Sequence, residues 1–150
     1  MKLRVVATAV GAAAVTLLAG SPAVAQAAAL KPYDHKDPYR SGCGNSARAV
    51  RTAPINSRAN GRVGTIKLMW SGKCKTNWTE ITTATSASGM ISVYRNGASD
   101  TFHFKKGNGG RHWGNMLYAN NVCAWGSATV QWNGGRGGQN GSGSTGKACG

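Results

Sequence analysis

Acidic residues are scarce in this chain of 150 residues. It has only four, Asp34, Asp37, Glu80 and Asp100, against 18 lysines and arginines. Two of them lie before residue 41, so two carboxylates held on rigid strands, as glycoside cleavage requires, are not expected. The net charge of +14 favours anionic partners of any kind without selecting one.

Recognised motifs of catalysis and metal binding are also missing. The sequence contains no G-x-S-x-G, H-E-x-x-H, P-loop or dinucleotide fingerprint. Its cysteines form no C-x-x-C pair, and no histidine pair lies near them, which argues against zinc. We therefore expect no metal, no cofactor and no enzymatic activity. The one enzymatic alternative is a small ribonuclease-like hydrolase, in which Glu80 acts with His103 or His112 and with Arg95 or Arg111.

Long apolar runs are confined to the beginning of the chain. Lys2 and Arg4 precede an uncharged run from Val5 to Leu18, and Ala23-Val24-Ala25 resembles an A-x-A cleavage site. We expect residues 1–25 to be a cleaved signal peptide, with a second possible site at 27–29, and the protein to be secreted. Loss of Lys2 and Arg4 would leave 16 basic and 4 acidic side chains, a net charge of +12.

The four cysteines are Cys43, Cys74, Cys123 and Cys149. An even number in an exported chain indicates disulfides, with three possible pairings. Cys149 follows a glycine-rich stretch, and a bond from it, most simply to Cys123, would tether that stretch to the domain. Each bridge would stabilise the fold by about 3–4 kcal/mol.

Short alternating segments predict an all-β fold, a small antiparallel barrel or sandwich of about seven short strands. The clearest is the hairpin in residues 64–81, where Ile66, Leu68 and Trp70 share one face. Asn96-Gly97 predicts a type I′ hairpin turn. The expected strands are 46–53 (alternatively a helical turn), 64–70, 77–81, 90–95, 100–104, 113–118 and 122–132.

Around this β domain, residues 41–132, we expect two less regular segments. Residues 26–40 should form an extended arm that is disordered by default, because proline biases it away from helix. Residues 133–150 should form a glycine-rich tail tethered by Cys149. The predicted structural core includes the tryptophans Trp70, Trp78, Trp113 and Trp125.

The arm and a basic glycine loop after residue 104 are the predicted partner-binding surfaces. The partner would be a secreted protein with an acidic surface or an anionic cell-wall polymer, whereas export argues against a physiological nucleic acid. The candidate residues are Tyr33, His35, Lys36, Tyr39, Arg40, Lys105, Lys106 and Arg111.

Two motifs resemble the YjfA-like family, an exported Gram-positive domain of unknown function. They are Asp37-Pro38-x-x-Ser41-Gly42-Cys43 and the stretch from Gly64 to Ile81, with Cys74 and Trp78 four residues apart. The resemblance covers about residues 33–130 and implies that Cys74 is the partner of Cys43. Members often carry a further cysteine before the D-P pair, which this chain lacks.

The resemblance also implies a function. Some members of the family resemble the small adaptor subunit of umbrella toxin particles, which joins a repeat-containing stalk protein to a lectin-bearing protein. We therefore expect a secreted, non-enzymatic protein-binding module of this kind. A stand-alone cationic antimicrobial or wall-binding protein is the second hypothesis, and the small hydrolase is the third.

Overall fold

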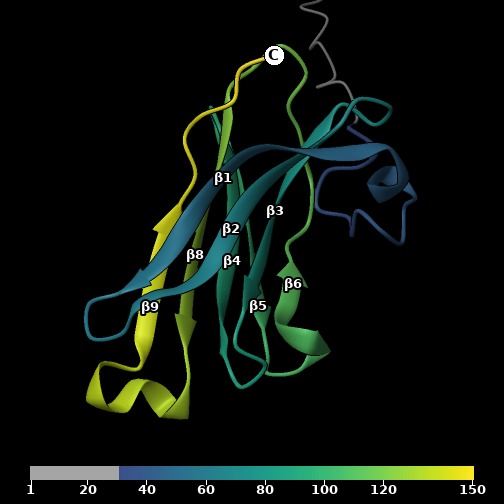
Figure 1. The fold of residues 1–150 in the computed structure, drawn as a ribbon. Coiled ribbons are helices and arrows are strands. Elements are labelled where there is room, and N and C mark those ends of the chain that lie inside the picture. Colours follow the sequence, from purple (N-terminus) through teal and green to yellow (C-terminus); the bar gives the residue numbers. More distant parts are fainter. Residues whose placement is uncertain (1–30) are drawn as a thin grey trace, which may run out of the picture. The chain divides into compact units, whose positions relative to one another are not determined.

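The computed structural model describes residues 31–150, so the predicted signal peptide and cleavage sites lie outside the described residues. Nine strands and three short 3-10 turns make up this part of the chain (Figure 1). The strands are β1 (Ala47–Ser57), β2 (Gly61–Ser71), β3 (Thr76–Thr83), β4 (Ser88–Arg95), β5 (Ala98–Phe104), β6 (Arg111–Trp113), β7 (Leu117–Tyr118), β8 (Ala124–Gln131) and β9 (Asn140–Ser144). The turns are η1 (Cys43–Ser46), η2 (Asn108–Gly110) and η3 (Asn133–Gly138).

The strands form one antiparallel sheet that curves into a nearly closed barrel, which confirms the predicted fold class. Their order is β5-β4-β8-β9-β1-β2-β3-β6, and the short β7 pairs with β3. The two ends of this path come close together. A Cβ placed on Gly114, just after β6, would lie 3.7 Å from the Cβ of Phe102 on β5.

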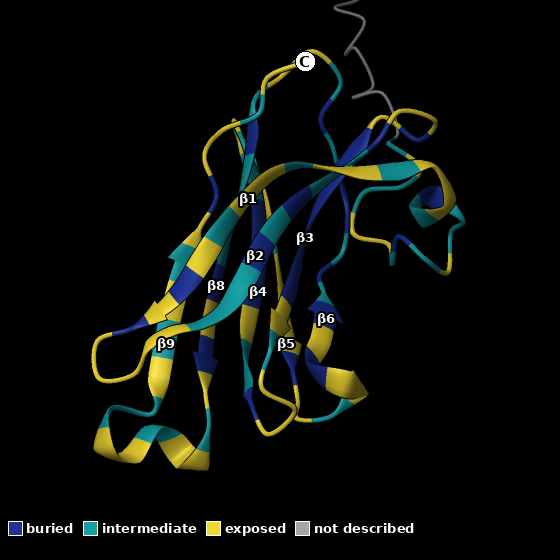
Figure 2. Ribbon diagram, viewed as in Figure 1, coloured by how far each residue is buried: buried dark blue, intermediate teal, exposed yellow. Residues whose placement is uncertain are grey.

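The β2–β3 hairpin has the predicted pairing and face. Ile66 and Leu68 are fully buried, and Ile66 lies opposite Ile81. β3 differs from an ordinary half-buried strand because every residue from Thr76 to Ile81 is buried (Figure 2). Its inner face meets the barrel core, and its outer face is covered by the segment before β1.

The predicted hairpin at Asn96-Gly97 is confirmed, but its predicted turn type is wrong. Arg95 lies opposite Ala98, so the loop has two residues. Gly97 has a φ of 73°, whereas Asn96 is not among the residues with positive φ. A type I′ turn needs positive φ at both positions.

β1 is longer than predicted, since it runs through Pro54 to Ser57. Pro54 lies opposite Thr65 of β2. The other neighbour of β1 is β9, which pairs with it in register only at Asn56. A proline is tolerated where one side of a strand lacks a regular ladder, because it has no N–H to donate.

The glycine-rich tail is a structural part of the barrel, so the prediction of a simple tether was incomplete. β9 pairs with β8 over five residues and with β1 at Asn56. Glycine is required here by close approach, since a Cβ on Gly143 would lie 2.6 Å from the carbonyl oxygen of Pro54. β9 thereby joins two halves of the sheet that would otherwise be separate.

The tryptophan prediction was right for Trp78 and too strong for the others. Trp78 is fully buried, whereas Trp70 and Trp113 are half-buried against the edges of the core. Trp125 lies outside the core, stacked on Tyr94 with ring centroids 5.6 Å apart. Aliphatic side chains of β1, β2, β3, β4 and β8 fill the barrel instead.

Both expected disulfides are present. Cys43 is bonded to Cys74, and Cys123 to Cys149. The first packs with Trp78 and Met116 in a cluster on the outer side of β3. The second ties the end of the chain to the segment before β8, and no free cysteine remains among residues 31–150.

Candidate functional site

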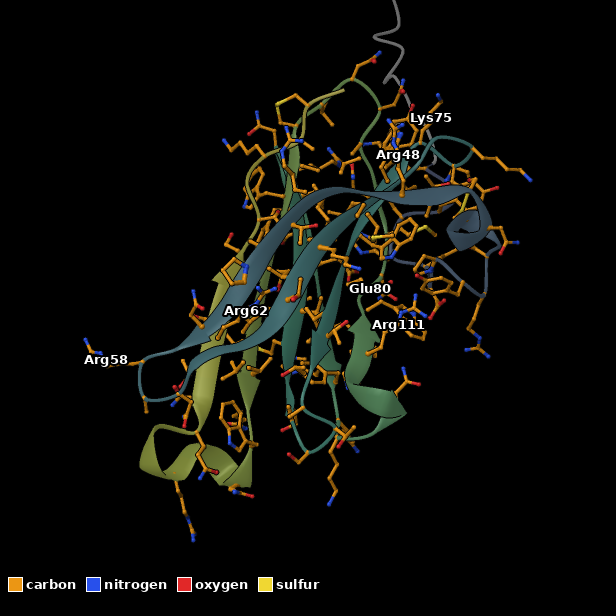
Figure 3. The ribbon with its side chains drawn as sticks, in the orientation of Figure 1. Arg48, Arg58, Arg62, Lys75, Glu80 and Arg111 are labelled. Atoms are coloured by element: carbon orange, nitrogen blue, oxygen red, sulfur yellow. A yellow bond between two sulfur atoms is a disulfide. The ribbon has the colours of Figure 1, made fainter. Side chains whose placement is uncertain are left out.

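An ion pair between a buried carboxylate and a half-exposed guanidinium lies on the outer face of the barrel where β3 meets β6 (Figure 3). The Nε of Arg111 donates to Oε1 of Glu80 at 2.8 Å, and its Nη2 donates to Oε2 at 2.9 Å. The hydroxyl of Tyr39 donates to the same Oε2 at 2.6 Å. Glu80 is only 6% exposed, so these hydrogen bonds replace the water that its carboxylate would otherwise bind.

The ionisation of this cluster follows from its contacts. Burial alone would raise the pKa of Glu80, but hydrogen bonds from Arg111 and Tyr39 and the charge of Arg111 outweigh it and lower the pKa. Burial and the hydrogen bond to the Glu80 carboxylate raise the pKa of Tyr39 to about 12. The cluster is therefore a fixed carboxylate–guanidinium pair with a neutral tyrosine.

The groups of the hydrolase hypothesis are not brought together. His112 follows Arg111 in β6, so its side chain points to the opposite face, where its ring lies 4.4 Å from that of Phe104. His103 is exposed on β5, opposite Met90. Of the proposed partners, only Arg111 reaches Glu80.

The segment of the arm that is described, residues 31–40, is a series of turns rather than an extended or disordered strand. Asp37 fixes one end of it. Its Oδ1 accepts from the backbone N–H groups of Tyr39 and Arg40, at 2.8 and 2.9 Å. Its Oδ2 accepts from Nε1 of Trp113 at 3.0 Å. Burial raises the pKa of Asp37, but these three hydrogen bonds outweigh it, so the net shift is downward.

The other end of the arm lies between β5 and the β6–β7 segment. The N–H of His35 donates to the carbonyl of Met116 at 2.8 Å, and the N–H of Met116 donates to the carbonyl of Lys36 at 2.9 Å. Nδ1 of His35 lies 2.6 Å from Oδ2 of Asp100 on β5. The arm thus covers part of the seam between the two ends of the sheet.

These contacts divide the predicted partner-binding residues into two groups. Tyr33 packs against the Cys43–Cys74 cluster, and the Tyr39 ring meets the Trp113 ring edge-on at 4.8 Å, so both tyrosines stabilise the arm. The other six are exposed, although Arg111 forms an ion pair with Glu80. The exposed ones are His35, Lys36, Arg40, Lys105, Lys106 and Arg111.

A groove of about 390 Å³ lies beside this basic surface, where β5 faces β6. Phe102, Lys105 and Trp113 are among its lining residues. Phe102 is 41% exposed, one of few large apolar side chains so accessible in residues 31–150. His112 also lines the groove; burial lowers its pKa, and its Nε2 has no hydrogen-bond partner within the described residues. We call this groove, with Lys105 and Lys106, the basic groove.

Sequence reasoning missed the role of the arm as a packed element. The one local signal was Asp37-Pro38, because an aspartate readily accepts hydrogen bonds from the backbone N–H groups that follow it in a turn. Neither a group of three or more potential metal ligands nor a helix long and apolar enough to cross a membrane occurs between residues 31 and 150.

Comparison with known proteins gives a family without a described activity. The uncharacterized protein YjfA of Bacillus subtilis (strain 168) is 35% identical over 63 residues, which are 42% of this chain and 38% of that protein. No solved structure matches the chain. A model of a family described as "Protein of unknown function (DUF2690)" matches residues 31–130, from the arm into β8. Since this match covers most of the sequence, the chain belongs to that family of proteins of unknown function.

Proposed function

We propose that this protein is a secreted, non-enzymatic module that binds an acidic protein partner through the basic groove. The observation that carries the proposal is the presence of exposed Phe102 and Lys105 in the lining of one groove, with the exposed Lys106 next to Lys105 in the chain. No ion pair joins either lysine to an acidic residue within residues 31–150. Asp37 also lines the groove, but its two carboxylate oxygens accept hydrogen bonds from Tyr39, Arg40 and Trp113. An apolar anchor with a lysine in the same groove suits a partner segment in which apolar and acidic side chains alternate.

Secretion is supported by the signal-peptide pattern of residues 1–25 and by the two disulfides, which persist in oxidising compartments. The finer form of the proposal is that the protein acts as the adaptor subunit of a secreted antibacterial toxin complex. That form rests on the family resemblance to umbrella toxin adaptors, and it requires at least one stable, large secreted partner.

The test is recovery of partners from culture supernatant by the tagged protein at native expression, with identification by mass spectrometry. Lys105→Glu with Lys106→Glu should lose a stoichiometric secreted partner, because the reversed charges repel its acidic segment. The control is Arg58→Glu with Arg136→Glu, which makes the same charge change at exposed positions outside the groove. The proposal would be contradicted if the wild-type protein were recovered without any partner, or if the lysine variant and the arginine variant lost the partner equally.

The second candidate, a lone cationic protein that binds anionic wall polymers, is favoured by cations outside the groove. Arg58, Arg62 and Arg136 are all exposed, and none is ion-paired within the described part of the chain. Such binding should weaken steeply between low and physiological salt and should respond to Arg58→Glu with Arg136→Glu as strongly as to the lysine variant. The two variants therefore distinguish the candidates.

A further inference from the structure

A second groove, of about 700 Å³, lies on the outer surface of five adjacent strands, β1, β9, β8, β4 and β5. The volume is in the range of about 300–1,000 Å³ that is usual for ligand sites. Its lining is chemically unlike that of the basic groove. It contains amide and hydroxyl side chains, one arginine and one histidine, and no acidic residue.

The sheet register places five of the lining residues in one row. Asn56 lies opposite Ser142, Ser142 opposite Thr129, Thr129 opposite Met90, and Met90 opposite His103. Residues directly opposite each other in antiparallel strands share a face, and all five are exposed. The row therefore crosses five strands, with one side chain about every 4.8 Å.

A second, shorter row runs beside the first. Gln131 of β8 lies opposite both Asn140 of β9 and Ser88 of β4. The side chains of Gln131 and Asn140 make no hydrogen bond to another residue in the described chain, and neither does that of Asn56. Each amide thus offers both a donor and an acceptor to a ligand.

Met90 interrupts the polar row with an apolar surface. It is 40% exposed and lies between Thr129 and His103. A flexible, polarizable thioether adapts its shape to an apolar face. A sugar ring combines the two features that this groove can recognise: hydroxyl groups at its rim, which pair with amides and hydroxyls, and an apolar C–H face.

We propose that this groove binds an oligosaccharide chain laid across the strands, with successive rings over successive strands. Gln131 and Asn140 hydrogen-bond to its hydroxyl groups, and Met90 contacts the face of one ring. Sugars that carry a carboxylate fit this groove as well as neutral ones do, because its lining contains Arg58 and no acidic residue. The site is separate from the basic groove apart from His103 and Phe104, which line both, and it does not depend on the proposed protein partner.

The test is a titration of the isotope-labelled secreted protein, followed by NMR, with the β-linked tetrasaccharides of glucose and of N-acetylglucosamine. We expect saturable shifts with at least one of them, confined to the residues of the two rows. Because both probes are uncharged, their affinity for the protein should not change with salt. The binding of an acidic partner at the basic groove should, in contrast, weaken as salt rises.

Gln131→Ala with Asn140→Ala should lower the affinity about tenfold, because two hydrogen-bonding amides are lost. The control is Ser99→Ala with Thr101→Ala, two exposed residues of β5 outside the groove, which should bind as the wild type does. Absence of saturable binding by both sugars, unchanged affinity in the amide variant, or shifts confined to residues 105–113 would overturn the proposal. The proposal would also be overturned if a titration with an acidic peptide shifted the NMR signals of the two rows and neither sugar did.

Discussion

Glu80 is the only glutamate in the chain, and its partners are far from it in the sequence. Tyr39 precedes it by 41 residues, and Arg111 follows it by 31. In the hydrolase hypothesis this glutamate acts as a catalytic carboxylate. The structure shows that the buried carboxylate of Glu80, paired with the half-exposed Arg111, fastens the arm to the outer face of β3, beside the fully buried Trp78.

Replacement of Glu80 by Gln should lower the free energy of unfolding by about 2 kcal/mol, because it removes a charge-assisted pair from a buried position. Arg111 is half-exposed and can turn to water, which limits the loss. Tyr39→Phe, which removes a single hydroxyl, should cost only about 1 kcal/mol. Urea unfolding with intact disulfides measures the free energy of unfolding of both variants. If Glu80→Gln were as stable as Tyr39→Phe, the ion pair of Glu80 with Arg111 would not contribute to stability as expected.

β9 completes the barrel although its composition is typical of a flexible linker. Its residues, from Asn140 to Ser144, alternate glycine with polar side chains. The glycines at 141 and 143 face neighbouring chain segments too closely for a side chain, and the polar residues between them face outward. The same composition that predicts a flexible tail is the one that lets this strand fit between β8 and β1.

Gly143→Ala should destabilise the protein by about 1–3 kcal/mol, because the new methyl group would collide with the backbone of Pro54. Gly146→Ala is the matched control. A Cβ there would be 3.9 Å from the side chain of Arg51, an ordinary contact, so its stability should match the wild type. Thermal unfolding compares the two, and equal midpoints would show that β9 is not held in this position in solution.

The arm is the element for which sequence reasoning was least successful. Residues 31–40 contain two prolines and several charges, which suggest a flexible segment. The segment instead covers Trp78 and the buried carboxylate of Glu80. Deleting it should therefore expose core surface, and the loss of a partner in such a deletion would not separate binding from misfolding. Charge variants in the basic groove avoid that ambiguity.

The few acidic side chains and the many cations have different roles in the described chain. All four acidic residues hold the arm: Asp34 and Asp37 from within it, Glu80 through Tyr39, and Asp100 through His35. Most of the cations have no acidic partner among residues 31–150 and remain on the surface. The molecule thus uses its acids for structure and presents its surplus of positive charge outward.

Stability should fall in two stages as the pH is lowered. Burial lowers the pKa of His112 below its ordinary 6.5, so the unfolded chain takes up its proton first, and the free energy of unfolding should decrease below pH 6.5. The pKa values of Glu80 and Asp37 lie below their ordinary 4.5 and 3.8, so the stability they contribute is present above those values and lost beneath them.

Urea unfolding at a series of pH values measures both stages. His112→Gln should remove the upper stage and leave the lower one, because it deletes the titrating imidazole alone. A free energy of unfolding that stays constant between pH 7 and pH 3 would contradict the pKa shifts of all three residues.

Local patterns in the sequence are sufficient to predict the class of the fold, the β2–β3 and β4–β5 hairpins and the even set of cysteines. These features are local: alternation of apolar residues, short turns and composition act over a few neighbouring residues. The sequence also indicated the basic loop, because charge can be read without coordinates.

Three features depend on the folded chain as a whole: what covers the outer face of β3, where the last strand inserts, and which acid meets which cation. Tyr39, Glu80 and Arg111 meet through three separate segments, and no local pattern connects them. The row from Asn56 to His103 likewise exists only because β9 joins β8 to β1. Such arrangements depend on burial and register between distant strands, which are properties of the folded chain and not of any one stretch of it.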